Sequence, residues 1–124
     1  MTEAQTALAL RAVACPKWRL MPGMLTHEGR RVMQVWPDDL GIHWSHLLDN
    51  RVVRDADALP NLTDPATLGC LLALVREAWE SPKANLSWVT DDKCMVVFDT
   101  GHAQRFLLGD TEAEALVVAL ESAP

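Results

Sequence analysis

Few residues of this 124-residue chain have the types and spacing needed for metal chemistry. His43 and His46 form an H-x-x-H pair, a spacing that would place both imidazoles on one face of a helix. The surrounding sequence is typical of a strand or turn instead, and no neighbouring cysteine or carboxylate completes a tetrahedral set. We therefore expect solvated or structural histidines, and no metal or other cofactor.

A second arrangement resembles the nuclease pattern PD…(D/E)-x-K. Asp38 follows a proline, and Asp91 lies two residues before Lys93. In such an enzyme the two carboxylates would hold Mg²⁺ while the lysine polarises the attacking water. However, a whole predicted helix separates the two halves, and the second half is typical of a polar turn. The sequence thus favours a chain without catalytic residues. The alternative functions are a small enzyme of unrecognised type, for which this nuclease pattern is the most concrete form, and a structural protein that self-assembles.

The three cysteines are far apart in the sequence and odd in number, so they predict neither a set of disulfides nor a C-x-x-C motif. Buried free thiols in a reducing compartment are the simpler interpretation of Cys15, Cys70 and Cys94. Cys94 and His102 would be close across a hairpin, but a thiolate nucleophile needs an open cleft that the sequence does not indicate. Phosphate-binding glycine loops and G-x-S-x-G elbows are also missing from the sequence.

Aromatic and acidic residues point to binding. The chain has five Trp and two Phe but no Tyr. Trp18, Trp36 and Trp44 are either core residues or anchors for a partner. The candidate partner-binding residues combine two of these tryptophans with nearby carboxylates: Trp36, Asp38, Asp39, Trp44, Asp55 and Asp57. Each carboxylate taken alone is also typical of a solvated loop.

Charge and hydropathy restrict the partners. The formal net charge is −6, which disfavours direct binding of nucleic acid and favours a basic patch on another protein. The N-terminus does not resemble a signal peptide, and no apolar run approaches the ~20 residues needed to cross a bilayer. The sequence therefore predicts a cytoplasmic protein that binds neither membranes nor free nucleic acid.

The pattern of apolar residues predicts one α+β domain over residues 1–124, in which antiparallel hairpins pack with three helices. Helices are expected at 2–14, 64–79 and 111–122, and the first should bury Leu10 and Val13. Thr111 and Glu114 form the sequence of a capping box. The expected strands are a hairpin over 23–36 with its turn at 27–29, short strands at 42–45 and 51–53, and a meander over 84–90, 94–99 and 103–108.

The helix over 64–79 should be central, because its apolar residues cover roughly 200° of the surface. Leu72 is expected in the core. Gly69 and Ala73, one turn apart, would allow another backbone to approach closely. The last helix also carries apolar residues on the side opposite its main apolar stripe. This side and the wide apolar surface of the helix over 64–79 together predict a homodimer.

Three stretches resemble small uncharacterised proteins encoded by phages and prophages: GMLTHEGRRV, LPNLTDPATLGCLLALVREAW and GDTEAEALVVALESAP. The resemblance covers most of the chain and is weakest over 37–58. Its motifs are caps, a core helix and turns, so it implies a phage-type origin in a bacterial host cell rather than a chemistry. We accordingly expect a non-catalytic accessory protein that binds a host protein, which could be a nucleic-acid-handling defence component.

Overall fold

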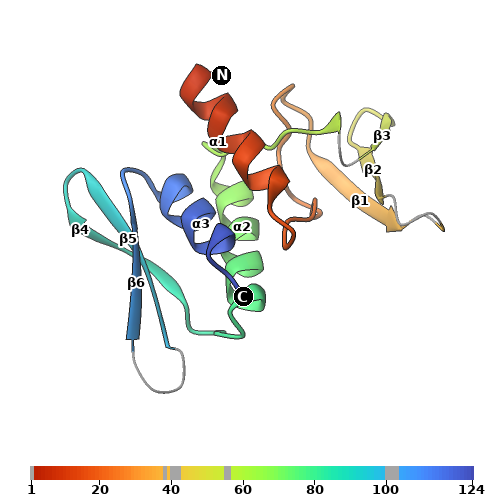
Figure 1. Ribbon diagram of the computed structural model, residues 1–124. Helices are drawn as coiled ribbons and strands as arrows, with labels where there is room; N and C mark the ends of the chain where they lie inside the picture. Colours follow the sequence, from red (N-terminus) through yellow and green to blue (C-terminus); the bar gives the residue numbers. More distant parts are fainter. Residues whose placement is uncertain (1, 38, 40–42, 55–56, 100–103) are drawn as a thin grey trace.

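The structure, a computed structural model, describes residues 2–37, 39, 43–54, 57–99 and 104–124. Three helices, α1 (Glu3–Ala14), α2 (Pro65–Ala78) and α3 (Glu112–Glu121), lie between two three-stranded sheets (Figure 1). The first sheet contains β1 (Val32–Pro37), β2 (His43–Leu47) and β3 (Val52–Arg54), and the second contains β4 (Asn85–Thr90), β5 (Lys93–Asp99) and β6 (Gln104–Gly109). Both sheets are antiparallel, which confirms the predicted α+β class. None of the helices in the described residues is long and apolar enough to cross a membrane.

Helix α1 begins with a full capping box, because the Thr2 and Gln5 side chains each bind the other residue's backbone N–H. The predicted buried face of α1 is wrong. Ala9 and Ala12 are fully buried, whereas Leu10 is 54% exposed. Since α1 packs against α3, these small side chains allow a close approach of the two helices.

Helix α2 begins as predicted, with Asp64 as N-cap and Pro65 in the first turn. Its buried side is narrower than expected: Leu71, Leu74 and Val75 are buried, but Leu72 is only half-buried. The expected cover over Gly69 is also missing, because no atom lies within 4 Å of a Cβ built at this exposed glycine.

Helix α3 is the most deeply buried of the three helices. Thr111 caps it by accepting a hydrogen bond from the Glu114 N–H at 3.1 Å, but the Glu114 side chain binds the Asp110 N–H instead of closing the box. The apolar back that was expected to be open is covered, since Ala115 and Ala119 are fully buried. This face is therefore unavailable to a partner.

The second sheet packs directly onto α3. Its meander follows the predicted strands, and the core side of β5 buries Cys94, Val96 and Phe98. Gly109 allows a close approach of the two backbones, because an added Cβ would lie 2.4 Å from the backbone nitrogen of Ala115.

Trp79, at the end of α2, links this sheet to the helices. Its indole N–H donates to the carbonyl of Ala119 at 2.7 Å, and its ring lies 4.5 Å from that of Phe98. The Arg105 guanidinium lies over the same ring, 5.1 Å from its centroid, in a cation–π arrangement. The indole therefore holds α2, α3 and the second sheet together.

The first sheet is built differently from the prediction. The expected hairpin over 23–36 is shortened: the chain turns at 27–29, Leu25 and Arg31 form one bridge, and three backbone hydrogen bonds join residues 23–26 to residues 30–32. Strand β1 pairs instead with β2, which pairs with β3 around the predicted turn at Asp49 and Asn50. Asn50 adopts a left-handed backbone with φ of 63°, a conformation that asparagine tolerates better than most residues.

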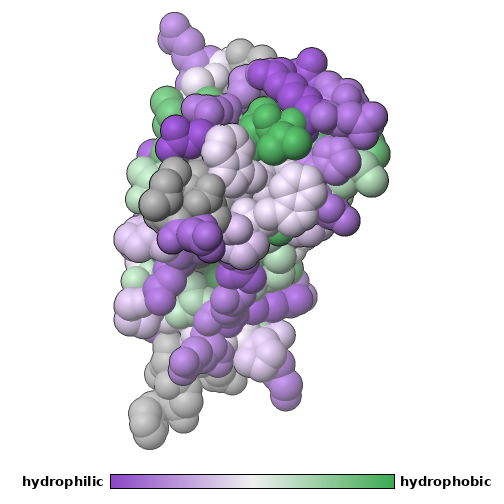
Figure 2. Space-filling model, turned by 90° about the vertical axis from the view of Figure 1, so that its right-hand side faces the viewer, coloured by the Kyte–Doolittle hydropathy of each residue, from purple (hydrophilic) through white to green (hydrophobic). Residues whose placement is uncertain are grey.

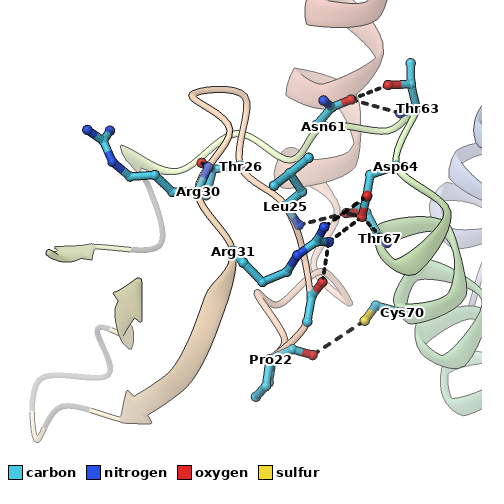
Figure 3. A network of polar contacts seen from close by, with 11 residues as sticks. Pro22, Leu25, Thr26, Arg30, Arg31, Asn61, Thr63, Asp64, Thr67 and Cys70 are labelled. Atoms are coloured by element: carbon cyan, nitrogen blue, oxygen red, sulfur yellow. Dashed lines mark hydrogen bonds and ion pairs between the residues drawn. The ribbon is translucent and has the colours of Figure 1, made fainter. Parts of the chain in front are cut away.

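A polar network joins the first sheet to α2, and we call it the Asp64 joint (Figure 3). The Asp64 carboxylate accepts hydrogen bonds from the Arg31 guanidinium at 2.7 and 3.3 Å, and from the backbone and hydroxyl of Thr67. The Thr67 hydroxyl in turn accepts from the Leu25 N–H at 2.8 Å. The Arg31 hydrogen bond, together with those from Thr67, outweighs desolvation and lowers the pKa of Asp64.

Candidate protein-binding site

The outward side of the first sheet carries Trp36, Trp44 and His46, and we call it the aromatic face. Trp36 and Trp44 lie directly opposite each other in the β1–β2 register. The Trp36 ring stacks on His46 with centroids 5.7 Å apart and an interplanar angle of 23°. Trp36 is nevertheless 41% exposed, so an ordered indole is presented to solvent.

Strand alternation explains why these rings face outward. The intervening residues Val35, Ser45 and Val53 point toward the core, and Ser45 is fully buried. A register shift between Val32 and Gln34 sets this alternation, because one extra residue changes which side of the strand faces the core.

An ion network fixes the turn at one end of this sheet. Arg30 binds both Glu28 and Asp49, and Arg51 donates to Glu28 at 2.8 Å. Desolvation raises the pKa of Asp49, but hydrogen bonds from Arg30 and from the Arg51 backbone outweigh it and lower the pKa overall. The two arginines near the turn are therefore neutralised within the chain.

Two described carboxylates beside the sheet, Asp39 and Asp57, have no ion-pair partner within the described part of the chain. Asp39 follows β1 and Asp57 follows β3, and both side chains are exposed. Arg54, across from Trp44, is an exposed cation of the same sheet. Over residues 36–58 the sequence holds five Asp and two Arg, an excess of three negative charges.

The structure thus brings together part of the predicted binding set. Trp36 and Trp44 share one face, and Asp39 follows the strand that carries Trp36. Asp38 and Asp55 lie outside the described residues. The side of the molecule that carries the first sheet is mostly hydrophilic, and hydrophobic residues form only small patches on it (Figure 2).

The nuclease-like residues are not assembled into a described site. Lys93 begins β5 in the second sheet and binds Asp110 rather than Asp91. Pro37, which precedes Asp38, ends β1 in the first sheet. In the part of the chain that the structure describes, no three His, Cys, Asp or Glu residues are grouped so that they could hold a metal ion.

The cysteines are poor nucleophiles. Burial raises the pKa of the thiols of Cys15, Cys70 and Cys94, so each thiol stays protonated at neutral pH. Cys15 and Cys94 are buried, and the Cys70 thiol faces the carbonyl of Pro22 at 3.7 Å. His102, the predicted neighbour of Cys94, lies outside the described residues.

A separate apolar groove of about 350 Å³ lies where the first turns of the three helices meet β4. Leu8, Leu62 and Leu68 line it together with Trp88, which is 52% exposed. No local sequence pattern predicts this groove, since its lining residues come from four separate elements. His46 was also missed as the ring that stacks on Trp36, although its position two residues after Trp44 places both on one side of a strand.

Comparison of this chain with protein-family models, with curated proteins and with solved structures gave no match.

Proposed function

We propose that this chain is a non-catalytic accessory protein that binds a basic surface of another protein through its aromatic face. The observation that carries the proposal is the exposed Trp36 indole, held by stacking on His46 directly opposite Trp44. An ordered, exposed tryptophan supplies a large contact area at a low entropic cost on binding.

The charge of the partner follows from the acidic excess around this face. Exposed Asp39 and Asp57 would attract a basic surface, and long-range attraction by a chain of net charge −6 would raise the association rate. Arginine and lysine side chains also bind favourably over indole rings, so one partner side chain can use both the acids and the tryptophans.

The resemblance to phage and prophage proteins suggests the kind of partner. We infer that it is a protein of the bacterial host, such as a defence component that handles nucleic acids. The groove of such a protein is basic because it holds phosphates, and an acidic protein can compete for it.

The experiment is a capture from bacterial lysate on three immobilised chains: the wild type, Trp36→Ala and Trp88→Ala. Trp88 is the matched control, because it is an exposed tryptophan of the other sheet. We expect a protein retained by the wild type and by Trp88→Ala but lost with Trp36→Ala. Its affinity should fall as salt is raised, and also in a variant that joins Asp39→Lys to Asp57→Lys.

Two results would contradict the proposal. One is capture that does not depend on Trp36. The other is Trp36-dependent binding of a single-stranded oligonucleotide by the purified chain, which would make the rings a stacking platform for bases.

A further inference from the structure

The edges of the two sheets differ in how they are protected. An edge strand presents unpaired N–H and C=O groups that can pair with another chain. Proteins commonly protect such edges with bulges, proline, charge or short length. Four described strands, β1, β3, β4 and β6, lie at sheet edges.

Three of these edges carry such protection. The register of β1 shifts between Val32 and Gln34, and the strand ends at Pro37. Strand β3 has only three residues and ends in Arg54. The register of β4 shifts between Trp88 and Thr90, which bends an edge away from further pairing.

Strand β6 has none of these features. It pairs with β5 over six consecutive positions without a shift, and it contains no proline. Phe106 and Leu108 point outward and are 53% and 56% exposed. Its one charged side chain, Arg105, lies over the ring of Trp79 rather than along the open edge.

We propose that β6 pairs antiparallel with β6 of a second copy of this chain, which joins the two second sheets into one six-stranded sheet. A two-fold axis at Leu107 gives the most complementary register. Phe106 then lies opposite Leu108 of the second copy, and this pair extends the β5 pairs of Phe106 with Val97 and of Leu108 with Met95. The outward side of the joined sheet therefore carries continuous apolar rows.

Charge favours a second copy in this register. Two chains of net charge −6 repel each other, so opposed acidic side chains would weaken the contact further. With the axis at Leu107, Gln104 faces Asp110 of the second copy and Arg105 faces Gly109. Each opposing pair along the edge thus holds at most one charged residue.

The contact is also large enough for a small dimer. Five residues of each β6, 105–109, would pair and form about five main-chain hydrogen bonds, at the lower end of the range of roughly 10 ± 5 found in stable interfaces. Burial of Phe106 and Leu108 occurs twice because the interface is symmetric. A self-complementary contact of this kind closes at two copies and does not continue into a fibre.

This inference does not depend on the proposed function. The two sheets lie on opposite sides of the helices, so a dimer through β6 would leave both aromatic faces open (Figure 1). Failure of either proposal therefore leaves the other standing.

The first test is sedimentation velocity of the purified chain from micromolar to hundreds of micromolar concentration. We expect the mass to rise from 13.7 kDa to twice that value. Leu108→Lys should keep the chain at 13.7 kDa, whereas the control Val89→Lys, on the exposed edge of β4, should still dimerise. A wild-type chain that stays monomeric over this range would overturn the proposal.

The second test reads the register by disulfide formation between chains. Phe106→Cys and Leu108→Cys chains are oxidised separately and as a mixture, with the wild type as a control for the native cysteines. Residues directly opposite in an antiparallel pair have Cβ atoms about 4.5–5.5 Å apart, so we expect a mixed dimer several times more abundant than either homodimer. Equal yields in all three samples would overturn the pairing through β6.

Discussion

The first sheet carries Trp36, Trp44 and His46 outward among polar and charged residues, whereas the second carries Met95, Val97, Phe106 and Leu108 outward without a charge between them. Both are three-stranded antiparallel meanders. The difference shows that topology does not determine what a sheet can bind. A face of mixed aromatic and polar residues fits a reversible partner of opposite charge, and an apolar face beside an open edge fits another copy of itself.

The two sheets are also attached to the helices by different interactions. The second sheet packs on α3 through apolar side chains and the close approach at Gly109. The first sheet buries Val32 and Leu47 and adds the Asp64 joint, in which one carboxylate serves both as the N-cap of α2 and as the partner of Arg31. Substitutions at the two attachments should therefore affect the two sheets separately.

The largest effect is expected from a change in the layer that both sheets share. Leu74→Asp places an unpaired charge at a position 1% exposed, which should cost about 4 kcal/mol or more and unfold the chain. Circular dichroism should show loss of both sheets together. Ala73→Asp is the control, because the neighbouring Ala73 is exposed. A cooperative transition with an unchanged midpoint in Leu74→Asp would show that the placement of α2 is wrong.

Gly109→Ala should affect mainly the second sheet. The new methyl group would meet the Ala115 backbone at 2.4 Å, so α3 must shift, at a cost of about 3 kcal/mol in the free energy of unfolding. Hydrogen exchange should rise in β4–β6 more than in β1–β3. Gly69→Ala is the matched control: its Cβ meets open space within a helix, and it should stabilise the chain by up to about 1 kcal/mol. Equal destabilisation by the two variants would contradict the packing at Gly109.

Asp64→Ala should loosen mainly the first sheet. It removes the N-cap of α2 and leaves Arg31 without its carboxylate, so we expect a loss of about 2 kcal/mol, measured by urea unfolding. Exchange should rise first in residues 23–54. Asp64→Asn keeps a capping side chain and should lose less.

The same joint predicts a pH dependence. Because the folded pKa of Asp64 is lowered, its stabilising contribution is complete at neutral pH and is lost as the pH falls through that lowered pKa. The wild type should therefore lose more stability than Asp64→Asn on acidification below about pH 4. Parallel pH profiles of the two chains would show that the ion pair with Arg31 contributes nothing.

The smallest effects on stability are expected at the exposed tryptophans. Trp36→Ala and Trp88→Ala should each change the free energy of unfolding by less than about 1 kcal/mol, since both rings are about half exposed. A larger loss in Trp36→Ala, measured by thermal unfolding, would show that this ring supports the fold and is not held ready for a partner.

Local signals in the sequence predicted much of the helical layer and the second sheet. Asp64, Pro65 and Thr111 mark helix starts through hydrogen bonds made within one turn, so their effect can be read without the tertiary structure. Polar turn residues likewise separate β4 from β5. The buried face of α1 was missed because its contact with α3 uses Ala9 and Ala12, whose small side chains give a weak apolar pattern.

The candidate site was less accessible to sequence reasoning. Trp36 and Trp44 could be named, but their pairing depends on a register shift between Val32 and Gln34 that no local pattern marks. The hairpin predicted over 23–36 is shortened for a related reason. Gly23 turns the chain with φ of 99°, and Thr26 bridges to Pro60, so only residues 23–26 stay hydrogen-bonded to residues 30–32, and β1 pairs along its length with β2.

The division of roles between the two sheets is tested most directly by sedimentation velocity of three chains at the same high concentration: the wild type, Trp36→Ala and Leu108→Lys. We expect the wild type and Trp36→Ala at twice 13.7 kDa, and Leu108→Lys at 13.7 kDa. A Trp36→Ala chain that is monomeric while Leu108→Lys remains dimeric would contradict this assignment, because self-association would then belong to the aromatic face.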